Sequence, residues 1–159
     1  MTIVHALTCE VEVVGRASAG ERVIAVQLPN RLGGRVIELS GDELLAQFVA
    51  DDALLLFTLA DFGGEDTLFI YLINAEGKIE ETVKLFHAYT NCVLKILNVG
   101  DQILFSFFNT SVEYSLQLIS STKVQIMPNV TGVYRENGLA MRSRLVLNER
   151  VVKTRDVND

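Results

Sequence analysis

The chain has 159 residues, which is enough for one domain with a proper hydrophobic core and short for two. Apolar residues make up 49% of the chain and charged residues 21%, a globular composition that excludes intrinsic disorder. The formal net charge of −6 disfavours nucleic acid and anionic membranes as partners and favours basic proteins or cations.

Short runs rich in Val, Ile, Leu, Phe and Tyr recur along the whole chain, and turn residues separate them, as is typical of β-strands. In chain order we predict strands at 11–14, 23–28, 36–39, 54–59, 67–73, 79–85, 93–97, 103–107, 112–119 and 123–127. The turns that separate them are predicted at 17–20, 29–34, 62–64, 74–77, 109–111 and 120–122. Residues 145–147 and 151–153 flank Asn148-Glu149-Arg150 as a final hairpin.

The clearest alternation of apolar and polar residues runs from Val112 to Leu118. A strand of this kind has one buried and one wet face, which is typical of antiparallel sheet. The fold class predicted is therefore all-β, an antiparallel meander of about ten to twelve short strands. We expect it to form a single domain over residues 1–159, with a frayed tail from about residue 154.

One segment carries a helix signal. Ser40 and Glu43 are spaced as a capping box ahead of the apolar residues 44–49. The same segment, however, resembles a later predicted strand, because residues 41–48 align with residues 100–107. We therefore favour a strand and allow at most one short helix near 41–49.

The chain also contains an internal repeat. Residues 52–57, 67–73 and 78–83 form a strand–strand–turn–strand unit, and residues 101–106, 112–119 and 123–127 repeat it. Units of this length resemble the blades of a β-propeller over roughly residues 20–145, which implies an open, incomplete propeller. A β-sandwich or a β-barrel accounts for the same strand spacing.

Candidate catalytic and metal-binding residues are few. The closest pairs of metal-ligating residues are His5 with Cys9 and His87 with Cys92, and neither has the two-residue gap of a zinc knuckle. The glycine pairs lack the lysine of a phosphate-binding loop. We therefore predict no catalytic residues, no metal and no cofactor. The start of the chain lacks the basic region of a signal peptide, so a cytoplasmic location is expected.

The most informative feature is a run of nine carboxylates between Arg35 and Lys78 that contains no lysine, arginine or histidine. Such a field attracts basic partners. We predict that a partner binds the following residues: Asp42, Glu43, Asp51, Asp52, Asp61, Glu65, Asp66, Glu76, Glu80 and Glu81. Because these residues fall mostly at predicted turns and strand edges, the partner is expected at a rim of the sheets.

In size, acidity and lack of catalytic motifs the chain resembles the immunity proteins with which bacteria neutralise nuclease toxins. That resemblance implies a non-enzymatic inhibitor that covers a basic active site by electrostatic attraction. Three other hypotheses stay open at this point. The carboxylates could merely solvate turns, a barrel or sandwich interior lined by Phe and Leu could hold a small apolar ligand, and an enzyme of unrecognised type is the third.

Overall fold

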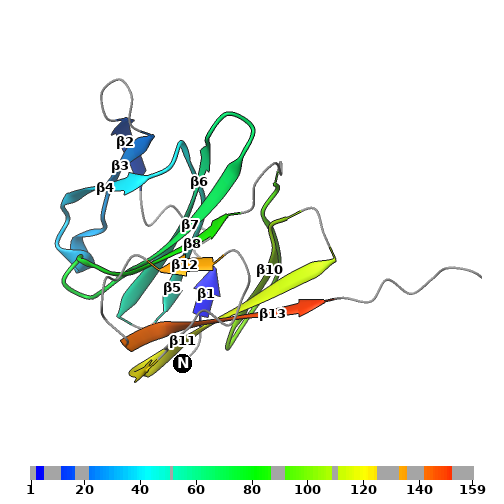
Figure 1. Ribbon diagram of the computed structural model, residues 1–159. Coiled ribbons are helices and arrows are strands. Elements are labelled where there is room, and N and C mark those ends of the chain that lie inside the picture. Colours follow the sequence, from blue (N-terminus) through cyan, green and yellow to red (C-terminus); the bar gives the residue numbers. More distant parts are fainter. Residues whose placement is uncertain are drawn as a thin grey trace, which may run out of the picture.

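The structure is a computed structural model that describes residues 3–5, 12–16, 22–50, 52–86, 92–108, 111–124, 133–135 and 142–151. Within these ranges the chain is all-β apart from one turn of 3-10 helix, as predicted (Figure 1). The elements are β1 (Ile3–His5), β2 (Glu12–Arg16), β3 (Val23–Gln27), η1 (Asn30–Leu32), β4 (Val36–Ser40), β5 (Glu43–Ala50), β6 (Ala53–Asp61), β7 (Asp66–Ile73), β8 (Ile79–Phe86), β9 (Lys95–Val99), β10 (Ile103–Ser106), β11 (Val112–Val124), β12 (Val133–Arg135) and β13 (Arg142–Val151).

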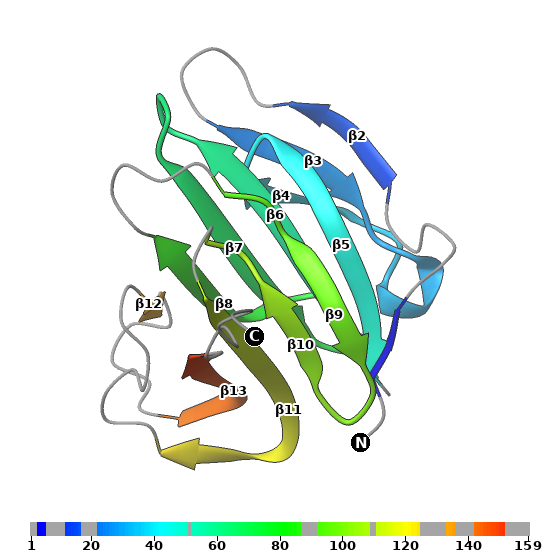
Figure 2. The ribbon, with the colours of Figure 1, turned by 90° about the vertical axis from the view of Figure 1, so that its right-hand side faces the viewer.

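The described strands form three antiparallel sheets, and none of them closes into a barrel. A central sheet has the strand order β1-β5-β6-β7-β8-β12. One outer sheet has the order β2-β3-β4, and the other has the order β13-β11-β10-β9. Figure 2 looks onto the stack, with β9 and β10 in front of the central strands and β2, β3 and β4 behind them. The predicted meander is thus a stack of three layers.

The central sheet is buried on both faces, which explains the long apolar runs in the sequence. Leu54 and Leu56 of β6 belong to the core shared with β3 and β4. Leu55 and Phe57 belong to the larger core shared with β10, β11 and β13. Because successive side chains of a strand point to opposite faces, a strand between two sheets needs apolar residues at every position.

The outer strand β11 shows the alternation predicted for it. Tyr114, Leu116 and Leu118 are buried against the central sheet, whereas Ser115 and Gln117 are only half-buried. The Tyr114 ring stacks on Phe105 of β10, with 5.4 Å between the ring centroids. One wet face and one packed face therefore distinguish an outer sheet from the central one.

Two predicted turns are wrong. Ser120-Ser121-Thr122 was predicted as a turn before a strand at 123–127, but β11 continues to Val124. The register against β13 shifts between Leu118 and Lys123, so β11 is irregular where the turn was predicted. Asn148-Glu149-Arg150 was predicted as a hairpin turn, but β13 runs straight through it to Val151. These three residues pair with Ser115, Tyr114 and Glu113 of β11, and the hydrogen bonds of this pairing override the turn preference of the polar residues.

The segment with the capping-box signal is strand β5, as favoured, and it lies between β1 and β6. The only helical turn among the described residues is η1, inside the predicted turn at 29–34, where it buries Leu32. The short edge strands β1 and β12 were not predicted. No described helix is long and apolar enough to cross a membrane.

The internal repeat is reproduced in part. Strands β6 and β7 correspond to β10 and β11, but the third strand of the second unit is the end of β11. Residues 125–127 and the predicted frayed tail lie outside the described residues. The resemblance to propeller blades stays a prediction.

Candidate functional site

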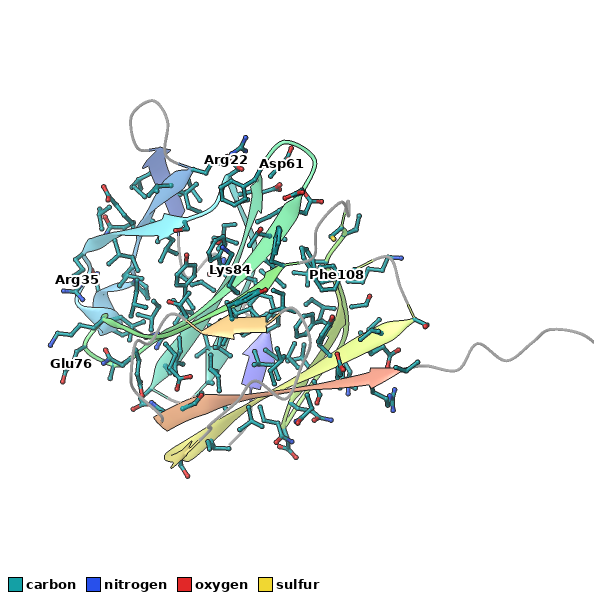
Figure 3. The ribbon with its side chains drawn as sticks, viewed as in Figure 1. Arg22, Arg35, Asp61, Glu76, Lys84 and Phe108 are labelled. Atoms are coloured by element: carbon teal, nitrogen blue, oxygen red, sulfur yellow. The ribbon has the colours of Figure 1, made fainter. Side chains whose placement is uncertain are left out.

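The antiparallel register divides the acidic residues between the two ends of the central sheet. Glu43, Asp61 and Asp66 lie where β5 begins, β6 ends and β7 begins. Asp52, Glu76, Glu80 and Glu81 lie at the other end of the same strands, as Asp61 and Glu76 illustrate in Figure 3. Strands of eight or nine residues separate the two groups by roughly 25 Å. The acidic run in the sequence is therefore not one patch in space.

Carboxylates at the Glu76 end are matched by cations of the same chain. Arg144 of β13 places its Nη1 atom 3.0 Å from Glu80 Oε2 and its Nη2 atom 3.9 Å from Asp52 Oδ1. The Nζ atom of Lys78 lies 2.9 Å from Glu76 Oε2, and this hydrogen bond and its charge lower the pKa of the Glu76 carboxyl. This end of the sheet is therefore largely self-neutralised.

Glu81 faces inward, so its side chain is not at the predicted binding surface. It is only 3% exposed. Its carboxylate accepts hydrogen bonds from Ser143 Oγ at 2.6 Å and from the backbone N–H groups of Arg144 and Leu145. These contacts tie β8 to β13 and give Glu81 a structural role. Asp51 lies outside the described residues.

Asp42 is also paired, on the side of the β2–β4 sheet. The Nη1 atom of Arg22 lies 2.6 Å from Asp42 Oδ2, and the same oxygen accepts the Asp61 N–H at 3.0 Å. The Arg22 guanidinium also lies over the ring of Phe62, 5.7 Å from its centroid. Figure 3 shows Arg22 beside the β6–β7 hairpin that carries Asp61.

Three carboxylates at this hairpin end share the opposite face of the central sheet. Glu43 pairs with Leu59, and Asp61 pairs with Asp66. Directly opposed residues in an antiparallel pair point to the same face. Leu59 packs against the core shared with β10, β11 and β13, so Glu43 lies on that face, and Asp61 follows two residues after Leu59.

Neighbouring backbone groups hold two of these carboxylates in place. Asp61 Oδ1 accepts the Gly64 N–H at 2.7 Å, and Asp66 Oδ2 accepts the Cys92 N–H at 2.6 Å. Glu65 lies in the turn between them and is partly exposed. We call Glu43, Asp61, Glu65 and Asp66 the acidic rim. Among the described residues none of the four forms an ion pair.

An apolar cavity of about 320 Å³ lies beside the acidic rim. It is lined by Leu45, Ala46, Leu59, Cys92, Val93, Leu94 and Ile96, which come from β5, β6 and the segment that enters β9. One of the lining side chains, Val93, is still 68% exposed. An apolar interior site was one of the open hypotheses, but its position was not predicted, because its walls come from segments more than 30 residues apart that only the stacking of two sheets brings together.

The two His/Cys pairs weighed as metal ligands in the sequence cannot be placed. Cys9 and His87 lie outside the described residues, and only the backbone of His5 is described. Cys92 is buried and forms no disulfide bond. No group of three metal-ligating side chains occurs within the described part of the chain.

Comparison with known proteins adds no relative. No protein-family model, no curated protein and no solved structure matches the chain.

Proposed function

We propose that the chain is a non-enzymatic protein-binding module that docks a basic partner through the acidic rim. The observation that carries the proposal is that Glu43, Asp61 and Asp66 share one face at one sheet end and form no ion pair with the described residues. Carboxylates without an ion-pair partner among the described residues can attract a partner's cations and speed the encounter.

The proposal retains four of the ten residues predicted from the sequence. It leaves out those that Arg22, Lys78 and Arg144 already neutralise, the buried Glu81, and Asp51, which lies outside the described residues. More particularly, we propose that the chain is a cytoplasmic inhibitor of a basic toxin nuclease. Such an inhibitor would cover the basic active site and needs no chemistry of its own.

Charge reversal at the two sheet ends tests the proposal. The double variant Glu43→Lys/Asp61→Lys is titrated with an oligolysine probe and with cytochrome c as a basic protein. The matched control is Asp52→Lys/Glu76→Lys, which changes the net charge equally at the other end of the sheet. Surface charges act over about 10 Å at 0.1 M salt, so only the rim variant should weaken binding, by roughly tenfold or more.

Two results would contradict the proposal. Affinity that is flat between low and high salt would mean that charge does not drive docking. Equal losses in the rim variant and its control would mean that net charge, rather than the acidic rim, attracts the probe.

A second candidate function is the binding of a small apolar ligand, and the cavity of about 320 Å³ favours it. This volume falls at the lower end of the range for ligand pockets. Native mass spectrometry of the purified protein tests this function, because a bound apolar molecule would appear as a discrete added mass. The variant Ala46→Leu, which places a larger side chain in the cavity wall, should reduce that added mass.

A further inference from the structure

We propose that the cavity beside the acidic rim receives one apolar side chain of the basic partner, flanked in the partner by lysine or arginine. The inference rests on the proposed function and specifies the chemistry of the segment that binds. The partner's cations would meet the carboxylates while the side chain between them enters the cavity.

The acidic rim and the cavity are continuous through two pairs of residues. Glu43 lies directly opposite Leu59, which is part of the cavity wall. Opposed residues of an antiparallel pair have Cβ atoms about 5 Å apart, so a group that reaches the Glu43 carboxylate lies within one side chain of the cavity. On the other side, Asp66 accepts a hydrogen bond from the backbone N–H of Cys92, and Cys92 also lines the cavity.

The wall chemistry favours an uncharged, apolar occupant. Leu45, Leu59, Leu94 and Ile96 supply aliphatic carbon from two different sheets. No charged side chain lines the cavity among the residues that the structure describes. The carboxylates of the acidic rim stand outside the cavity, where water or a partner's cation can reach them. Charged and apolar surface are therefore separate, which suits a partner segment in which an apolar residue lies between two basic residues.

Exposed apolar surface at the edge of the cavity supports a macromolecular partner. Val93 lines the cavity and is still 68% exposed. A neighbouring chain can cover the exposed part of Val93, whereas a small ligand inside the cavity leaves it in water.

Three synthetic peptides test the inference. The first carries one phenylalanine between lysines, the second has serine in place of the phenylalanine, and the third keeps the phenylalanine but replaces every lysine with serine. Burial of a phenylalanine side chain predicts that the first peptide binds roughly ten to a hundred times more tightly than the second. The third should bind far more weakly than the first, since it lacks the cations.

Protein variants test whether the affinity gained from the phenylalanine side chain comes from the cavity. Val93→Ser and Ala46→Leu should each remove most of the gain from phenylalanine and leave the affinity for the serine peptide unchanged. Val151→Ser is the matched control, because Val151 is 65% exposed on β13 at the opposite edge of the same sheet. Circular dichroism and thermal unfolding confirm that each variant is folded.

The outcomes separate the inference from the function on which it rests. Equal, salt-dependent binding of the phenylalanine and serine peptides would overturn the inference and leave the proposed function standing. Equal binding of the phenylalanine peptides with and without lysines would also overturn the inference. It would favour the binding of an apolar ligand that carries no charge. Failure of both lysine peptides to bind at low salt would overturn the proposed function as well.

Discussion

The buried carboxylate of Glu81 accepts a hydrogen bond from Ser143 Oγ at 2.6 Å and joins two sheets of the stack. The residues are 62 positions apart in the chain, on β8 and β13, and each is 3% exposed. Two backbone N–H groups of β13, from Arg144 and Leu145, complete the coordination of the carboxylate. Hydrogen bonds to an ionised acceptor are roughly twice as strong as neutral ones, so this contact fixes the register of β13 against the central sheet.

We predict that Glu81→Ala lowers the free energy of unfolding by about 2–4 kcal/mol, because buried donors lose their shared acceptor. The neighbouring variant Glu80→Ala is the control. It removes a partly exposed ion pair to Arg144, so it should cost about 1 kcal/mol or less. Urea unfolding measures both values, provided that the dependence of the unfolding free energy on urea concentration is the same in both variants. Equal losses would show that the buried network stabilises the fold no more than the exposed ion pair does.

A glycine in the β7–β8 turn joins the central sheet to the loop that contains η1. Gly77 has φ of +71°, and a Cβ atom there would collide with the backbone carbonyl of Leu32. The Gly77 carbonyl also accepts a hydrogen bond from Arg35 Nε at 3.1 Å. Both the backbone conformation and the close approach therefore require glycine at this position.

Gly63→Ala separates the two requirements. Gly63 has φ of +77° but open space around it, so alanine there bears only the cost of the left-handed conformation, about 1 kcal/mol. Gly77→Ala adds the collision and should cost at least about 2 kcal/mol more. Thermal or urea unfolding compares the two variants, and equal destabilisation would argue against a close contact with Leu32.

The hydrogen bond from the Cys92 N–H to Asp66 is expected to control access to the thiol. In a Cys9→Ser background, Asp66→Ala should raise the rate of Cys92 modification by a thiol reagent about tenfold, because a lost hydrogen bond makes local opening easier. Asp66→Asn keeps an acceptor oxygen and should react almost as slowly as the parent. Asp61→Ala, in the adjacent turn, is the control, and a similar rise there would point to general loosening of the hairpin.

The pH dependence of stability should reveal Tyr114. Burial of the phenol, together with the negative charges of Glu149 and of an ionised Cys92, raises the pKa of Tyr114 to about 12. The folded state thus holds this proton more tightly than the unfolded state, in which a tyrosine titrates near 10. The stabilising effect is complete below about pH 10 and is lost as the pH rises toward 12.

Tyr114→Phe should therefore weaken the loss of stability between pH 10 and 12 that the parent protein shows. Denaturant midpoints across this range provide the measurement, and ultraviolet absorbance follows the phenolate directly. Tyr134→Phe is the control, since Tyr134 is 56% exposed. A parent protein in which every tyrosine titrates near pH 10 would refute the expected burial of Tyr114.

The local sequence pattern was sufficient to predict most strands, because side-chain alternation and turn preference depend on only a few neighbouring residues. The strand near 41–49 was favoured over a helix because residues 41–48 resemble residues 100–107, and both segments are strands in the structure. Local pattern was not sufficient where a distant strand supplied the hydrogen bonds. The polar residues 148–150 were predicted as a turn, yet they are strand because they pair with residues 113–115 of β11.

The same division holds for the candidate site. The sequence by itself determined the acidic character of the chain, the all-β class and the place of most carboxylates at strand ends. Only the tertiary structure decided which carboxylates act together, because antiparallel pairing sends Asp61 and Glu76 to opposite ends of one sheet. It also decided that Glu81 is buried and that an apolar cavity adjoins Glu43, since both depend on a second sheet stacked over the first.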